Sequence, residues 1–124
     1  MNAMLLHPGV TWTSEKKLLI AGPCVVESRD LCLLVAEEMK NLSEELGYTY
    51  VFKASYDKAN RTSADSFRSI GFEESLRILE EISSSLLIPV ITDVHESSEV
   101  PAVAQAVDML QIPAFLCRQT SLLL

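Results

Sequence analysis

The stretch that decides the fold is residues 51–63, VFKASYDKANRTS, which predicts a strand that runs directly into a polar, cationic loop. In extended geometry Val51, Lys53 and Ser55 point to one side of the strand, and the residues between them point to the other. A lysine therefore lies on a segment that otherwise suits a core, and a buried ammonium group needs an anionic partner. The pattern predicts an anion site at the end of this strand. A snorkelling lysine beside a solvated loop is the alternative reading.

The loop after the strand carries side chains that hold phosphate or carboxylate groups. Lys58 and Arg61 stand there with Asn60 and Thr62, and Asp57 is the single acid among them. The net charge of the whole chain is -7, so any anion site has to be built locally.

The composition limits the possible function classes. The chain has 124 residues, of which 48% are hydrophobic and 22% charged, as expected for one soluble domain with a core. The negative charge argues against nucleic acid or an anionic membrane surface as a partner. Three widely spaced cysteines without a CxxC pair indicate a reducing compartment. We expect no signal peptide and no membrane span, which makes the cytoplasm the expected location.

Strands and helices alternate along the chain. Residues 4–17 predict a hairpin that turns at Pro8-Gly9, with Leu5, Val10 and Trp12 as apolar contacts. The apolar run 17–22 is typical of a parallel strand covered on both faces. Further strands are expected at 50–55, 88–93 and 107–112, and a second helix at 72–86 with Leu76, Leu79, Ile82 and Leu86 directed inward.

The first helix has clear end signals. Ser28 is a suitable N-cap, and Gly47 sits where a C-terminal stop is expected. A short later helix is expected to use Ser97 as its cap and to accept Pro101 in its first turn. The apolar positions of the first helix follow helical spacing and are Leu31, Leu34, Val35, Met39, Leu42 and Leu46.

Polar residues at the strand ends share one side of the predicted sheet. Alternation of strands and helices predicts parallel strands with right-handed crossovers. Both a (β/α)8 barrel and an open doubly wound sheet carry their ligand sites at the carboxyl ends of the strands. A complete barrel typically needs about 250 residues, but the apolar run 121–124 comes without a stop signal, so we expect a truncated chain. The residues at this common edge are Cys24, Lys53, Ser55, Asp93, His95 and Gln111.

Four motifs in order carry a resemblance to a known family. They are IAGPC at 20–24, FKAS with KANR within 52–61, TDVHE at 92–96 and QIPAFLCRQT at 111–120. Together they resemble the bacterial and plant 3-deoxy-D-manno-octulosonate 8-phosphate synthases over residues 18–124. The related 3-deoxy-D-arabino-heptulosonate 7-phosphate synthase of the aromatic pathway shares Gly-Pro-Cys, but carries Lys-Pro-Arg in place of Lys-Ala-Asn-Arg. That contrast favours the sugar-acid enzyme.

The resemblance implies an α/β fold, the N-terminal half of a (β/α)8 barrel with about four parallel strands. Residues 1–17 would form the hairpin that closes the barrel bottom, and residues 18–124 the partial barrel. The family's activity is condensation of phosphoenolpyruvate with D-arabinose 5-phosphate, in the Kdo branch of lipopolysaccharide biosynthesis, by a homotetramer. The 124-residue piece alone is expected to be inactive. Alternatives are a heptulosonate synthase-like enzyme, a non-catalytic phosphometabolite-binding fragment and a purely structural fragment.

The resemblance also implies roles for individual residues. Lys53, Lys58 and Asp93 would be catalytic, and Arg118 would reach the sugar phosphate of a neighbouring subunit. A satisfied amide at a strand end is the alternative for Gln111, and a structural hydrogen-bonded pair is the alternative for Asp93 with His95. The substrate-binding residues implied by the family are Ser55, Asn60, Arg61, Thr62, His95, Gln111, Pro113, Ala114, Phe115 and Arg118.

Cys24 bears on the enzyme subtype. Taken alone, one cysteine at a strand end is more often a small buried hydrophobic residue than a metal ligand. Metal-dependent members of the family have cysteine here and metal-independent members have asparagine, so the resemblance implies one ligand of a divalent metal such as zinc, iron or manganese. The remaining ligands, a histidine, a glutamate and an aspartate, would come from later strands. Cys32 and Cys117 are expected to be packing residues.

Overall fold

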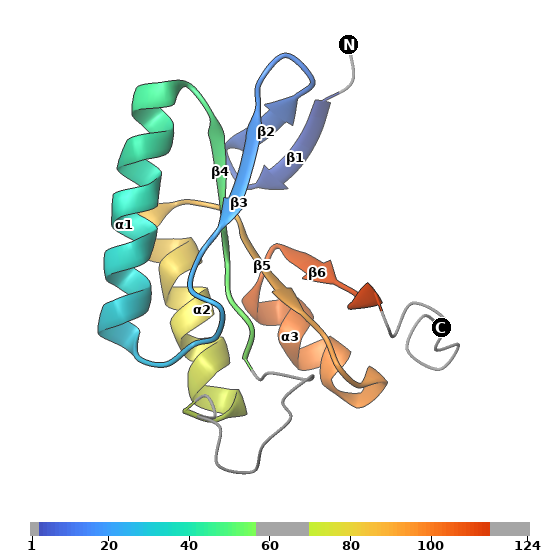
Figure 1. The fold of residues 1–124 in the computed structure, drawn as a ribbon. Coiled ribbons are helices and arrows are strands. Elements are labelled where there is room, and N and C mark those ends of the chain that lie inside the picture. The colour runs from blue at the N-terminus through green and yellow to red at the C-terminus, as the bar shows by residue number, and fades with distance from the viewer. Residues whose placement is uncertain (1–2, 57–69, 115–124) are drawn as a thin grey trace.

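The computed structural model describes residues 3–56 and 70–114, which form a hairpin and a four-stranded parallel sheet (Figure 1). The hairpin pairs β1 (Ala3–His7) with β2 (Val10–Thr13). The sheet has the order β3-β4-β5-β6, made of Leu18–Ala21, Thr49–Lys53, Val90–Asp93 and Met109–Gln111. The helices are α1 (Arg29–Leu46), α2 (Phe72–Leu86) and α3 (Val100–Ala106), the last preceded by the 3-10 turn η1 (Ser97–Glu99).

Consecutive strands are neighbours and parallel, as the alternation predicted. β4 lies in the interior of the sheet, and its residues alternate as expected. Phe52, Ala54 and Tyr56 enter the core on the helix side, whereas Lys53 and Ser55 on the other side are only partly buried. The predicted α/β architecture, with parallel strands in chain order and crossover helices between them, is therefore confirmed for the part of the chain that the structure describes.

The end signals of α1 are confirmed. The Ser28 hydroxyl accepts a hydrogen bond from the backbone N–H of Leu31 at 3.1 Å. Gly47 has φ of +73°, a left-handed conformation that glycine adopts without strain, and it ends the helix. Local sequence was sufficient here because both signals act within one helical turn.

The buried face of α1 differs from the expected one. Cys32 and Ala36 are fully buried, whereas Leu34 is 57% exposed and Leu42 and Leu46 are also exposed. The small side chains of Cys32 and Ala36 let α1 approach the sheet closely. The three leucines lie on the part of the helix surface outside that contact. The packing role expected for Cys32 is confirmed, and its burial raises the pKa of the thiol to about 11. Cys117 lies outside the described residues.

α2 has the predicted bounds, and Leu76, Leu79 and Ile82 lie in the core as expected. Leu86 packs against that core but is only partly buried. The helix meets both α1 and α3. It therefore occupies the centre of the helical layer.

Three smaller expectations were wrong. Ser97 opens the 3-10 turn and caps nothing, although Pro101 does lie in the first turn of α3 as predicted. β3 is not covered on both faces, because the described helices pack on one face only and Ile20 is 44% exposed. Leu5 in the hairpin is 69% exposed and makes no core contact of the expected kind.

A polar cluster ties the hairpin to the amino-terminal ends of β5 and β6. The Asp108 carboxylate lies 2.9 Å from Nδ1 of His7 and accepts hydrogen bonds from the Ser83 hydroxyl at 3.0 Å and the Val90 N–H at 2.9 Å. Ser83 and Asp108 both face the same ring nitrogen of His7, so the cluster lacks the two-sided histidine of a Ser-His-Asp relay. The cluster therefore has a structural role, which is to hold the hairpin against the sheet.

Among the helices of residues 3–56 and 70–114, none combines the length and apolar character required to cross a bilayer.

Candidate functional site

The carboxyl ends of β3 and β4 stay together beyond the strands themselves. Ser55 donates its backbone N–H to the Cys24 carbonyl at 3.2 Å and accepts the Val26 N–H at 2.9 Å. Val25 and Ser55 form an isolated parallel bridge. The motifs at residues 20–24 and 52–55 thus lie side by side, as the shared strand-end position predicted.

Asp93, at the end of β5, joins the neighbouring strand end through its side chain. One carboxylate oxygen accepts a short hydrogen bond from the Ser55 hydroxyl, and the other lies 2.9 Å from Nε2 of His95. Burial acts to raise the pKa of Asp93, but the adjacent His95 ring and the hydrogen bond from the Ser55 hydroxyl outweigh it and lower the pKa overall. The structure therefore brings three predicted site residues into direct contact and favours an ionised Asp93.

The end of β6 extends this edge. Asp93 pairs with Gln111 in the ladder, and the Gln111 carbonyl accepts the Val94 N–H at 2.9 Å. Gln111 remains partly exposed, Pro113 is buried, and Ala114 is exposed. The backbone of Gln111 is committed to the sheet, whereas its side-chain amide stands at the same edge as Asp93.

Lys53 ends β4 on the same side of the sheet as Ser55. It is partly buried, and its ammonium group forms no ion pair with any residue of 3–56 or 70–114. A cation held at a strand end without a protein counter-ion can bind an anionic ligand. Together with the Asp93 carboxylate and the Ser55 hydroxyl, this edge offers groups for an anion and for hydroxyl groups of one ligand.

Gly22 allows β3 to approach Lys53 closely. A Cβ atom built at Gly22 would lie 1.9 Å from the backbone oxygen of Lys53. Any side chain at this position would push the two strands apart. The glycine of the Gly-Pro-Cys motif thus has a steric role in placing Lys53, which spacing alone did not reveal.

Cys24 is an exposed free thiol at this edge. An accessible thiol is a good donor for zinc or iron, so the residue fits one position of a metal site. Within the described ranges no three His, Cys, Asp or Glu side chains are grouped closely enough to hold a metal ion. The residues described here therefore fit one ligand of such a site and leave the others to be supplied from elsewhere.

Six predicted site residues lie outside the described residues. They are Lys58, Asn60, Arg61, Thr62, Phe115 and Arg118.

Tyr56 forms a second layer that the sequence reasoning missed. Its hydroxyl donates to the Glu99 carboxylate at 2.6 Å and accepts the backbone N–H of His95 at 3.2 Å. Its ring meets the His95 ring edge-on, with centroids 5.2 Å apart. The strand pattern placed Tyr56 on the core side, but nothing local predicted a partner 43 residues away.

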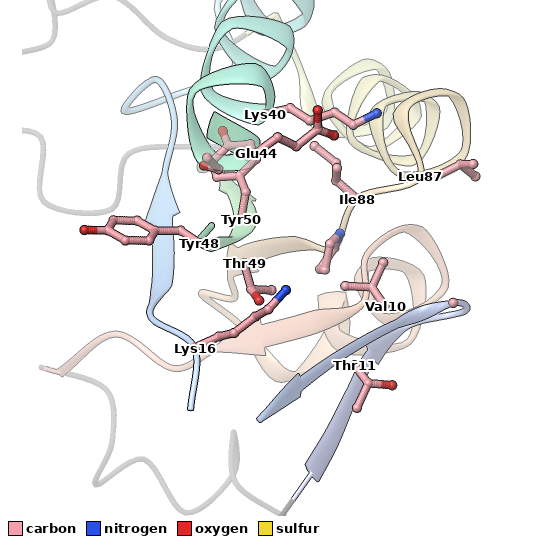
Figure 2. Close-up of a pocket in the computed structure, with 13 residues that line it drawn as sticks. Val10, Thr11, Lys16, Lys40, Glu44, Tyr48, Thr49, Tyr50, Leu87 and Ile88 are labelled. Carbon is pink, nitrogen blue, oxygen red and sulfur yellow. The ribbon is translucent and has the colours of Figure 1, made fainter. Parts of the chain in front are cut away.

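A separate cavity of about 300 Å³ lies at the opposite end of the sheet (Figure 2). The turn of the hairpin, the last turns of α1 and the start of β4 surround it, and Lys16 and Lys40 are its basic residues. α1 and α2 both end beside it. None of the predicted site residues within the described ranges lines this cavity, so it is distinct from the strand edge that holds Lys53 and Asp93.

Comparison with known proteins identifies a family and several similar proteins. Residues 7–124 match the family described as DAHP synthetase I. Over 109 residues the chain is 53% identical to a protein of Campylobacter jejuni serotype O:6 named 2-dehydro-3-deoxyphosphooctonate aldolase, covering 88% of this chain and 40% of that protein.

Two further relatives carry the same name. The protein of a Synechococcus species is 57% identical over 86% of this chain, and that of Dechloromonas aromatica is 59% identical over 82%; 37% of each relative is covered. The chain thus spans about 40% of the length of the curated relatives it matches. The resemblance expected from the four motifs is confirmed: this chain belongs to the DAHP synthetase I family and is similar to its 2-dehydro-3-deoxyphosphooctonate aldolases.

Proposed function

We propose that the protein to which this chain belongs condenses phosphoenolpyruvate with D-arabinose 5-phosphate to form 3-deoxy-D-manno-octulosonate 8-phosphate and inorganic phosphate. The observation that carries the proposal is the shared strand edge. Lys53, which has no ion pair within residues 3–56 and 70–114, stands there with the connected Ser55, Asp93 and His95. The name of the similar proteins supports the same reaction.

Both substrates are multiply anionic, so their mutual repulsion opposes the approach of the reacting carbons. Lys53 and Lys58 would offset that repulsion near the reacting centre, while Arg61 and Arg118 would hold the sugar phosphate. Ionised Asp93 would accept hydrogen bonds from sugar hydroxyls. The other proposed substrate contacts are Ser55, Asn60, Thr62, His95, Gln111, Pro113, Ala114 and Phe115.

The reaction forms one carbon–carbon bond and breaks one carbon–oxygen bond. The enol carbon of phosphoenolpyruvate attacks the sugar aldehyde, and the aldehyde oxygen takes up a proton. Water adds at the adjacent carbon, and phosphate leaves from that carbon as the keto group forms. Groups that hold both substrates in the reacting orientation contribute most to such a step, because the translational and rotational entropy of the two substrates is then lost on binding and not in the chemical step.

Cys24 would hold a divalent metal together with ligands from beyond this chain. Such a metal would act as a Lewis acid toward a substrate oxygen. We expect a chelator to abolish activity of the longer protein. Cobalt substitution should give a thiolate-to-metal absorption band that Cys24→Ser removes, and a band that persists in the variant would exclude Cys24 as a ligand.

The proposal extends to assembly and cellular context. Arg118 acting on a neighbouring subunit would make a homo-oligomer, a tetramer in the synthase family, part of the active unit. Residues 1–17 would close the bottom of a barrel whose first half is residues 18–124. The product would serve Kdo and lipopolysaccharide biosynthesis in the cytoplasm.

The direct test is product formation by the longer protein from the two substrates, with phosphate release as a second readout. Lys53→Met keeps the aliphatic stem and removes the charge, so it should lower kcat/KM by at least about 100-fold, by analogy with the loss of one charge-stabilising donor. Lys17→Met is the matched control, because Lys17 lies at the other end of the sheet, 5.7 Å from the Tyr48 ring. Equal activity of the two variants would refute the role of Lys53.

The second candidate is a heptulosonate synthase, which the description of the matched family favours. Replacing arabinose 5-phosphate with erythrose 4-phosphate separates the two enzymes. Calorimetry of the 124-residue chain with phosphoenolpyruvate tests a third possibility, a binding fragment without catalysis, because binding without product formation would indicate that class.

A further inference from the structure

One phenol oxygen closes the segment between β5 and α3. The Tyr56 hydroxyl accepts the backbone N–H of His95 at 3.2 Å and donates to the Glu99 carboxylate at 2.6 Å. His95 and Glu99 begin and end a five-residue segment, which also contains a Glu99 N–H to Glu96 carbonyl bond of 3.0 Å. Both ends of the segment are therefore hydrogen-bonded to one side chain, that of Tyr56, which follows β4 in the chain.

Tyr56 is itself firmly held. It is 2% exposed, and its ring meets Phe72 nearly perpendicularly, with centroids 5.1 Å apart. Burial, reinforced by the Glu99 carboxylate, raises the pKa of the phenol well above its ordinary value. The hydroxyl consequently keeps its proton at neutral pH and donates it to Glu99.

The held segment carries a predicted site residue. His95 contacts Tyr56 through its backbone and ring, and its Nε2 lies 2.9 Å from the Asp93 carboxylate, whose other oxygen binds Ser55. A continuous series of contacts thus runs from Glu99 at the start of α3 to the strand edge. Displacement of the segment would turn the His95 ring and change the orientation of Asp93.

We propose that Tyr56 and Glu99 are positioning residues that hold His95, and through it Asp93, in the orientation required for the sugar substrate. The proposal deepens the proposed function and rests on it for its kinetic part. Neither residue is required to touch substrate, because both act from the layer behind the strand edge.

The kinetic test uses the longer protein with phosphoenolpyruvate and arabinose 5-phosphate. Tyr56→Phe keeps the ring contacts and removes only the hydroxyl; it should lower kcat/KM for arabinose 5-phosphate by roughly 10-fold, about the value of one hydrogen bond. KM for phosphoenolpyruvate should change by less than about twofold, because Lys53 points to the face of β4 opposite Tyr56. Glu99→Ala should reproduce this pattern, the double variant should be no worse than either single one, and Glu99→Gln, which keeps an acceptor oxygen, should restore most of the activity.

A second measurement does not depend on catalysis. In the 124-residue chain, Tyr56→Phe should speed hydrogen exchange of the His95 amide by roughly 10-fold, since that N–H loses its acceptor. The neighbouring Val94 amide, bound to the Gln111 carbonyl, should keep its rate. Tyr50→Phe is the matched control, because it removes another buried tyrosine hydroxyl, bonded to the Ala21 carbonyl at 2.8 Å, without touching this segment.

The outcomes separate the two proposals. If the longer protein forms no product while the His95 amide responds as expected, the proposed function fails and the positioning geometry stands. An unchanged His95 exchange rate in Tyr56→Phe overturns the positioning proposal, as does an equal loss of kcat/KM in Tyr50→Phe. Additive losses in the Tyr56 and Glu99 double variant would also overturn it, because the two residues would then act independently.

Discussion

Replacing Gly22 by alanine should disrupt the junction of β3 and β4. The new Cβ would lie 1.9 Å from the Lys53 carbonyl oxygen and 2.9 Å from the carbonyl carbon. Both neighbours are backbone atoms, so no side chain can rotate away. Relief of the clash requires the strands to separate by about 1 Å or more, since non-bonded carbon contacts are normally near 3.5 Å.

The energetic cost follows from what that separation disturbs. Overpacking at a site that cannot relax costs about 1–3 kcal/mol. The two backbone hydrogen bonds of Ser55, at 3.2 and 2.9 Å, lie just beyond the clash, and weakening them adds up to about 0.5–1.5 kcal/mol each. We therefore expect Gly22→Ala to lower the free energy of unfolding by about 2–6 kcal/mol.

Urea unfolding of the 124-residue chain, followed by far-ultraviolet circular dichroism, measures this cost. Gly47→Ala is the matched control. Gly47 has φ of +73° and open space around its Cβ position, so its substitution carries only the left-handed backbone penalty of about 1–2 kcal/mol. The two glycines thus separate a steric cost from a conformational one.

The result that would refute the reasoning is a Gly22→Ala chain as stable as the wild type, or no less stable than Gly47→Ala. Either outcome would mean that β3 and β4 can part at this point without loss. The steric explanation for the glycine of the Gly-Pro-Cys motif, and for the placement of Lys53, would then have to be given up.

Four further substitutions test the core, the polar clusters and the exposed face of α1 by urea unfolding. Asp108→Ala leaves three hydrogen-bonding groups without their acceptor and should cost about 3–5 kcal/mol; a loss below 1 kcal/mol would show that the hairpin cluster is dispensable. The lowered pKa of Asp93 means that its ionised form stabilises the fold above the unfolded-state pKa of about 4, and that this contribution disappears as the pH falls through the folded-state pKa. Asp93→Asn should therefore be less stable than the wild type at pH 7, by about 1–3 kcal/mol, and the gap should narrow toward pH 3; a constant gap would contradict the shift. Leu79→Ala, in the core, should cost about 2–5 kcal/mol, whereas exposed Leu34→Ala should stay within about 0.5 kcal/mol, and similar losses would contradict the assigned face of α1.

Local signals predicted much of this molecule. The cap at Ser28, the stop at Gly47 and the bounds of α2 depend on interactions within one or two helical turns, so they can be read from neighbouring residues. The alternation of residues 51–56 also predicted that Lys53 and Ser55 lie on one side of the sheet, because successive side chains of a strand point to opposite faces. The sequence predicted that Ser55 and Asp93 lie at the same edge of the sheet. It did not predict their direct hydrogen bond, because the two residues are 38 positions apart in the chain.

The sequence by itself determined the order of elements, the parallel sheet and the strand edge at which the polar residues gather, since hydrophobic period and chain connectivity act locally. Tertiary packing alone decided which face of α1 is buried, because small residues such as Ala36 matter only when a second surface approaches them. It also decided that Gly22 must lack a side chain and that Tyr56 finds Glu99. Those outcomes depend on distances between strands and helices that no short stretch of the chain contains.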